Sequence, residues 1–158
     1  MNSGLKEKTT TIGEICNREV VFAARDTTVQ TAAKLMRHYH VGSLVIVDDR
    51  YGKRIPAGIV TDRDIVVEVG ATELDPKVIT IGDIMVAELI TVPESKGVLE
   101  TMEVMRLKGV RRLPVVDGDG GLVGIVTIDD LLGVLAEELA DMTRIISREQ
   151  AREIQGRK

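Results

Sequence analysis

One seven-residue stretch occurs twice in this chain, as Gly-Ile-Val-Thr-Asp-Arg-Asp at 58–64 and as Gly-Ile-Val-Thr-Ile-Asp-Asp at 124–130. The β-branched residues after the glycine favour a buried strand. Thr-x-x-Asp then favours a helix start, because the hydroxyl can cap a backbone N–H and the acid suits the positive end of the helix dipole. The pattern predicts backbone N–H groups that can bind an anion, beside a carboxylate that can accept hydrogen bonds from two ribose hydroxyls.

The repeat extends well beyond this motif. Three further pairs of segments match: 12–15 with 81–84, 29–41 with 98–110, and 44–48 with 113–117. A single Thr-x-x-Asp is most often only a capping box that binds nothing. Capping alone does not explain two whole repeated units, so the chain is predicted to contain two pseudo-symmetric halves with one such motif each.

The order helix, strand Leu-Pro-Val-Val-Asp, turn, Gly-Ile-Val-Thr-x-x-Asp and helix resembles the cystathionine-β-synthase (CBS) domain, and the pair resembles a Bateman module. The resemblance covers about residues 11–140, and Thr-Asp-Arg-Asp-Ile at 61–65 is similar to small stand-alone prokaryotic CBS-pair proteins. It implies an α/β fold of the α+β type, with two pseudo-symmetric repeats, each a small sheet packed with two helices. The expected segments are a mobile N-terminus at 1–10, repeat 1 at 11–70, a linker at 71–79, repeat 2 at 80–140 and a helical extension at 141–158.

The residues themselves assign roles in two equivalent sites. Asp64 and Asp130 are expected to bind ribose hydroxyls, and the hydroxyls of Thr61 and Thr127 are expected near the ribose or a phosphate. This set of groups suits a nucleoside phosphate.

Phosphate charge calls for cations, and arginine binds phosphate oxygens well. The candidates are Arg63, Arg111 and Arg112. Because Arg111 and Arg112 align with Gly42 and Ser43 of the first repeat, the two sites are expected to be unequal, with one tighter and more sensitive to salt.

The resemblance adds further residues. In CBS pairs the repeated motif lines a cleft between the repeats that binds adenosyl ligands, with the adenine resting on apolar side chains that here would be Val21 and Ile90. The remaining motif residues carried over are Gly58, Ile59, Val60, Gly124, Ile125 and Val126. The first repeat departs from the family pattern at Val45, where proline is frequent, as at Pro114.

These observations predict a regulatory module that binds AMP, ADP or ATP, with NAD or S-adenosylmethionine as further candidates, and that signals by changing shape. The expected protein is not an enzyme, because the chain has no His-supported nucleophile, no Gly-x-x-x-x-Gly-Lys loop and no metal-ligand cluster. Its regulated target is expected in another chain. The alternative is a structural or stress-related homodimer whose Thr-x-x-Asp motifs only cap helices.

Composition narrows the possible partners. The net charge of −4 gives no general attraction to nucleic acid or to an anionic membrane. Aromatic residues are few (Phe22, Tyr39 and Tyr51), which disfavours base stacking on single strands. Cys16 aligns with Met85 and is expected to be a small packing residue. The sequence shows neither a signal peptide nor an apolar run that could span a membrane, so a soluble cytoplasmic protein is expected.

The C-terminal segment carries a regular apolar pattern. Apolar residues recur at steps of four and three, at Ile128, Leu132, Leu135, Leu139, Met142 and Ile146. This predicts a helix to Gln155, about 40 Å long at 1.5 Å per residue, with a stripe near the coiled-coil period. One CBS pair is too small to cover that stripe, so a homodimer is expected, and the resemblance implies modules paired into a disc. The alternative is a helix that frays after about Leu139.

Overall fold

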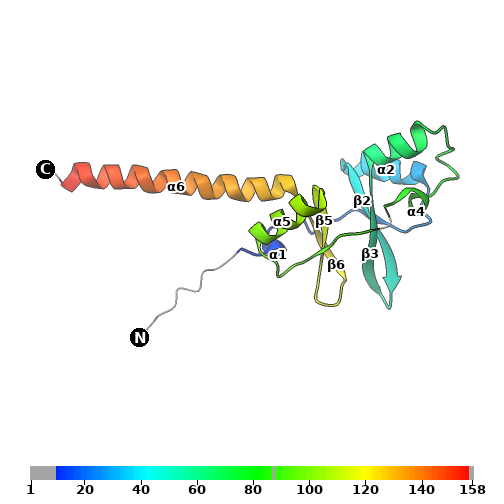
Figure 1. Ribbon diagram of the computed structural model, residues 1–158, viewed down its shortest axis with the longest axis horizontal. Helices are drawn as coiled ribbons and strands as arrows, with labels where there is room; N and C mark the ends of the chain where they lie inside the picture. The colour runs from blue at the N-terminus through cyan, green and yellow to red at the C-terminus, as the bar shows by residue number, and fades with distance from the viewer. Residues whose placement is uncertain (1–9, 87, 157–158) are drawn as a thin grey trace.

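The computed structural model describes residues 10–86 and 88–156, which form two three-stranded sheets and their helices (Figure 1). In each sheet the first strand is parallel to the second, and the second and third form an antiparallel hairpin. The strands are β1 (Phe22–Ala23), β2 (Ser43–Arg50), β3 (Lys53–Thr61), β4 (Val92–Pro93), β5 (Arg112–Val116) and β6 (Leu122–Thr127). The predicted α+β fold with two equivalent repeats is confirmed. The predicted mobile segment at 1–10 falls almost wholly outside the described residues.

The helices begin and end where local chemistry favours it. Thr28 caps α2 by accepting from the backbone N–H of Thr31, and α2 and α5 end at left-handed residues, His40 and Gly109. The helices are α1 (Ile12–Ile15), α2 (Val29–Tyr39), α3 (Asp62–Asp64), the π-helix η1 (Ile65–Gly70), α4 (Ile81–Ile84), α5 (Val98–Lys108) and α6 (Ile128–Gly156).

The end of the first motif helix differs from what its sequence predicts. A glycine at position 70 predicts a left-handed helix end, but Gly70 is not among the glycines with positive φ. Instead the backbone N–H of Ala71 donates to the carbonyl of Val66, five residues back, at 2.9 Å. The left-handed residue comes three positions later, at Glu73 with a φ of 58°, where the Leu74 N–H donates to the Val69 carbonyl at 3.2 Å, as in a Schellman helix end.

Each repeat places its first short helix on the core of the other repeat. Ile12 of α1 packs among the buried residues of the second sheet, and Ile81 of α4 packs among those of the first. The Ile12 N–H donates to the carbonyl of Lys96 at 2.8 Å, and the Ile81 N–H donates to that of Thr27 at 2.9 Å. Each hydrophobic core therefore contains residues from both sequence repeats.

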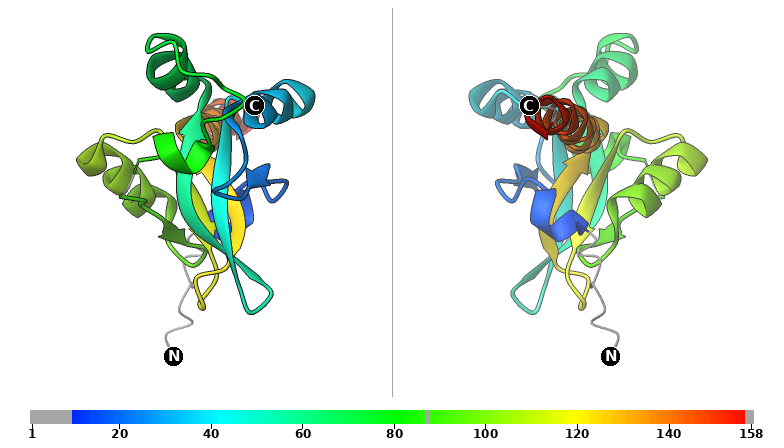
Figure 2. Two further views of the ribbon diagram at one scale, coloured as in Figure 1. Left: turned by 90° about the vertical axis from the view of Figure 1, so that its right-hand side faces the viewer. Right: turned by 90° about the vertical axis from the view of Figure 1, so that its left-hand side faces the viewer.

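The two sheets lie next to one another at the centre of the molecule, with α2 and α5 on opposite sides (Figure 2). Strands β3 and β6 are in contact. An ion pair between Lys53 and Asp119 joins the tips of the two hairpins. The two repeats thus form one body, and any site between them is held from both sides.

Helix α6 starts on this body and then leaves it (Figure 1). Its first turns pack on α5 and β6, and Leu131 is fully buried. The helix continues to Gly156, which confirms the predicted long C-terminal helix over the alternative of an end near Leu139. Within the described residues, no helix has the length and apolar character needed to cross a membrane.

Candidate functional site

Two clefts lie between the repeats. Each is lined by the Thr-x-x-Asp motif of one repeat and by residues at or just before the first two strands of the other. The larger cleft has a volume of 560 Å³. Its motif side comes from the first repeat and its other side from the second. The lining residues are Ile59, Thr61, Asp62, Arg63, Asp64, Val86, Glu88, Leu89, Ile90, Gly109, Val110, Arg111, Arg112 and Leu113.

The smaller cleft has a volume of 260 Å³ and reverses these roles. Its motif side comes from the second repeat, and its other side comes from the first. The lining residues are Asn17, Glu19, Val20, Val21, Val41, Gly42, Ser43, Arg112, Ile125, Thr127 and Asp130. Val21 and Ile90 therefore each line a cleft together with the motif of the other repeat.

The motif carboxylates are rigidly held. In the larger cleft, the backbone N–H and the hydroxyl of Thr61 both donate to Asp64 Oδ2 at 2.8 Å. In the smaller cleft, the same groups of Thr127 donate to Asp130 Oδ2 at 2.7 and 2.8 Å. None of the described residues donates to either Oδ1. Each cleft thus contains a fixed carboxylate with one oxygen available for ligand hydroxyls.

The backbone N–H groups at the motif helix start are already occupied, which corrects the sequence-based expectation that they bind an anion. The Asp62 N–H donates to the Gly42 carbonyl at 3.1 Å, and the Asp64 N–H donates to the Thr61 hydroxyl at 3.1 Å. The Arg63 N–H donates to the Asp62 carboxylate at 2.8 Å. A phosphate in the larger cleft would therefore have to rely on side-chain cations.

Those cations are distributed unevenly. The described lining of the larger cleft includes three arginines and three acids, whereas that of the smaller cleft includes one arginine and two acids. These are Arg63, Arg111, Arg112, Asp62, Asp64 and Glu88 in the larger cleft, and Arg112, Glu19 and Asp130 in the smaller one. Arg112 lines both clefts because it opens β5, directly opposite Thr127 of β6. The larger cleft is thus the better match for a phosphorylated ligand.

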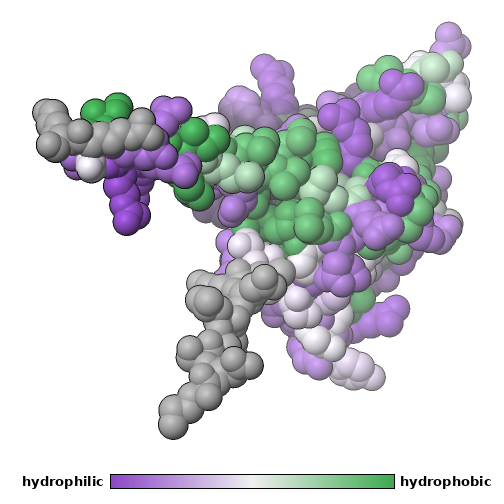
Figure 3. Space-filling view, turned by 60° about the vertical axis from the view of Figure 1, so that its left-hand side comes forward, coloured by the Kyte–Doolittle hydropathy of each residue, from purple (hydrophilic) through white to green (hydrophobic). Residues whose placement is uncertain are grey.

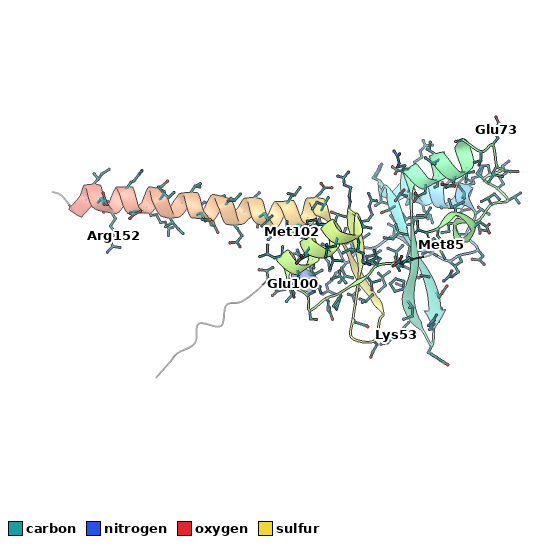
Figure 4. All side chains as sticks on the ribbon, viewed as in Figure 1. Lys53, Glu73, Met85, Glu100, Met102 and Arg152 are labelled. Atoms are coloured by element: carbon teal, nitrogen blue, oxygen red, sulfur yellow. The ribbon has the colours of Figure 1, made fainter. Side chains whose placement is uncertain are left out.

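Four of the predicted site residues do not line either cleft. The side chains of Val60 and Val126 are fully buried in the two cores. A Cβ on Gly58 would lie 2.8 Å from Met85 Sδ, and a Cβ on Gly124 would lie 2.5 Å from the sulfur of Cys16. These glycines allow the other repeat to approach closely, and Figure 4 shows Met85 beside β3.

Cys16 and Met85 are equivalent in the structure, as the alignment of the repeats predicts. Each packs against the motif glycine of the other repeat. Burial raises the pKa of the Cys16 thiol, which leaves it less reactive at neutral pH. A packing role for Cys16 follows.

Sequence reasoning missed the segments that precede the first strand of each repeat. Asn17 and Glu19 line the smaller cleft, and Val86 and Glu88 line the larger one. These pairs are related by the same offset of 69 residues as Ile12 and Ile81. Val21 and Ile90 are related by the same offset. The alignment of the repeats therefore pointed to these neighbouring residues as well.

No group of three or more metal-binding side chains comes together in residues 10–86 and 88–156. His38 and His40 lie at the exposed end of α2, outside both clefts.

Comparisons with known proteins show the family of the chain and agree with its fold. The family model for the CBS domain matches residues 12–70 and 81–137. An uncharacterised protein of Methanopyrus kandleri is 39% identical over 127 residues, which cover 80% of this chain and 63% of that protein, so the match spans less than two thirds of the relative.

Two solved structures are similar over most of the chain. A CBS domain pair in complex with 5′-methylthioadenosine and S-adenosyl-L-methionine has a TM-score of 0.71 and 28% identity, covering 82% of this chain and 98% of that one. A hexameric CBS-CP12 protein from bloom-forming cyanobacteria has a TM-score of 0.70 and 31% identity, covering 79% of this chain and 67% of that one.

Proposed function

Because this chain belongs to the CBS domain family, with two CBS repeats, we propose that it is a regulatory module that binds an adenosine-containing nucleotide between its repeats. One observation supports this most strongly: each cleft sets a fixed carboxylate of one repeat opposite an apolar residue of the other. A ribose and an adenine attached to it need such a pair of surfaces. The similar CBS pair that was solved with two adenosyl compounds adds support.

The charges favour a phosphorylated ligand in the larger cleft, so we propose AMP, ADP or ATP there, ahead of NAD or S-adenosylmethionine. Arg63 and Arg111 are exposed, and Arg112 is half-buried between the two clefts. Guanidinium groups bind phosphate oxygens with good geometry. The smaller cleft, with fewer cations, suits a less charged adenosyl compound.

Signalling would follow from the position of the clefts. A ligand that contacts Asp64 on one repeat and Ile90 on the other bridges the two repeats. It would therefore favour one relative arrangement of the repeats over others. In this proposal the protein is not an enzyme, its target is another chain, and it works in the cytoplasm, where adenine nucleotides are used.

A second candidate function is supported by the capping geometry itself. Both Thr-x-x-Asp motifs form complete hydrogen-bonded boxes without any ligand. In a structural homodimer, these motifs would only have to start their helices. Exposed apolar side chains on the helices of the body, among them Val66, Leu99 and Leu107, offer surfaces on which two modules can pair.

A panel of ligands in thermal unfolding separates the two functions. We expect stabilisation by at least one of AMP, ADP, ATP, NAD and S-adenosylmethionine. A ligand at 100 times its dissociation constant adds about 2.7 kcal/mol, which raises the melting temperature of a chain this size by about 5–10 °C. If no compound in the panel shifts the melting temperature, the structural homodimer is the correct function.

Arg111→Ala is expected to weaken ATP binding by about 1.4- to fivefold, because an exposed ion pair contributes about 0.2–1 kcal/mol. Binding of adenosine, which has no phosphate, should not change. The ATP affinity of the parent protein should also fall with added salt, and that of the variant should fall less. Titration calorimetry at two salt concentrations measures both effects. Arg106→Ala, on the exposed side of α5 and outside the larger cleft, is the matched control.

A further inference from the structure

The outer part of α6, from Ala136 to Gly156, has no apolar side chain buried against the rest of the described chain. Every described residue from Ala136 to Gly156 is exposed. Figure 4 shows Arg152 far from both sheets, and Figure 1 shows the helix extending beyond the body. A helix of this kind gains most of its stability when an amphipathic face is packed.

The exposed part carries a continuous apolar stripe. Leu139, Met142 and Ile146 follow Leu135 at steps of four, three and four, and they are 63%, 61% and 56% exposed. Ile145 lies beside them and is 67% exposed. Figure 3 shows that hydrophobic side chains also lie on the surface where α6 joins the body. Apolar positions at this period form the seam of paired helices.

The charges of α6 are divided along its length. Residues 129–141 contain five acidic residues and no basic one, whereas residues 142–156 contain three basic and two acidic residues. Two copies of α6 side by side in the same direction would set the acidic halves against each other. In opposite directions, each acidic half would face the half that carries Arg144, Arg148 and Arg152.

We propose that α6 pairs with α6 of a second copy of this chain in antiparallel orientation. The seam is self-complementary, as a two-fold symmetric interface requires. The arrangement sets Leu139 of each helix against Met142 of the other and Leu135 against Ile146, so its centre lies between Ala140 and Asp141. A membrane surface is a poorer partner, because helices that bind it carry basic residues on their polar face, and the inner half of α6 is acidic. The inference does not depend on any nucleotide.

Assembly is tested by changing the seam. The double variant Leu139→Glu, Met142→Glu is expected to halve the mass measured by light scattering, since four like charges would meet at the centre of the pair. Ala151→Glu, on the opposite side of the helix, is the matched control and should leave the mass unchanged. Both side chains in the double variant are exposed, so the melting temperature of the body should not fall. A mass unchanged in the double variant would overturn the proposal.

The relative direction of the two helices is tested with spin labels on cysteines placed at Ala140, Ser147 and Ala151 in turn, in a Cys16→Ser background. In an antiparallel pair, the distance between the two labels grows by about 3 Å for each residue away from the centre, twice the helical rise. A distance that stays constant across the three positions would mean a parallel pair. The absence of any interchain distance, or recruitment of the full chain to vesicles with anionic lipids, would show that the stripe serves another partner. Each of these outcomes contradicts the proposal.

Discussion

Asp64→Asn is expected to weaken nucleotide binding in the larger cleft about tenfold or more. A hydrogen bond to a charged group contributes about 1.5–3 kcal/mol, and about 1.4 kcal/mol corresponds to a factor of ten in affinity. Asparagine keeps one acceptor oxygen for the N–H and hydroxyl of Thr61, so the helix start should survive. Asp130→Asn should have the same effect in the smaller cleft. Calorimetry of each variant gives affinity and stoichiometry separately.

Asp83→Asn provides the matched control for this prediction. Asp83 accepts from the N–H and hydroxyl of Thr80 at 2.9 and 2.7 Å, in the same capping geometry, but it lines neither cleft. Its replacement should change stability slightly and affinity not at all. Unchanged affinity and stoichiometry in both cleft variants would show that Asp64 and Asp130 only cap their helices.

Ile12→Ala is expected to lower the free energy of unfolding by about 2–5 kcal/mol, the usual cost of removing a buried large aliphatic side chain. Ile12 is fully buried although α1 is a single turn near the start of the described chain. The loss should lower the melting temperature by about 4–20 °C. Denaturant or thermal unfolding measures it, and Val78→Ala, at an exposed position, is the control.

A double-mutant cycle tests which core Ile12 supports. It packs in one cluster with Val92 of the second sheet, whereas Leu44 belongs to the cluster of the first. Residues in contact show coupling of about 0.5–3 kcal/mol, and distant ones are additive to within about 0.5 kcal/mol. Ile12→Ala should therefore couple with Val92→Ala and be additive with Leu44→Ala. The reverse pattern would mean that α1 packs on its own repeat in solution.

The sequence is sufficient wherever the cause of a structure is local. The β-branched runs form β3 and β6, Thr61 and Thr127 cap helices with the acids three residues on, and the apolar stripe after Thr127 forms one helix. Hydrogen bonds and periodicity within a few residues decide these features. The duplication by itself also makes the two motif carboxylates equivalent, because each occupies the same position in its repeat.

Contacts between segments far apart in the sequence required the tertiary structure. The carbonyl of Gly42 occupies the Asp62 N–H, and Arg112 reaches both clefts, although neither relation has a signal in the local pattern. Gly58 and Gly124 likewise serve close packing between repeats, where the sequence suggested ligand contact. A motif shows which groups a segment has, but not which of them a distant segment will cover.

The placement of α1 and α4 illustrates the physical reason. Each short helix has the same local pattern and could complete either of two similar cores, its own or that of the other repeat. Its apolar residues would be buried in both cases, so hydrophobic periodicity does not distinguish them. The choice depends on the path of the connections and on backbone bonds such as that from Ile12 to Lys96, which form only when the whole chain is folded.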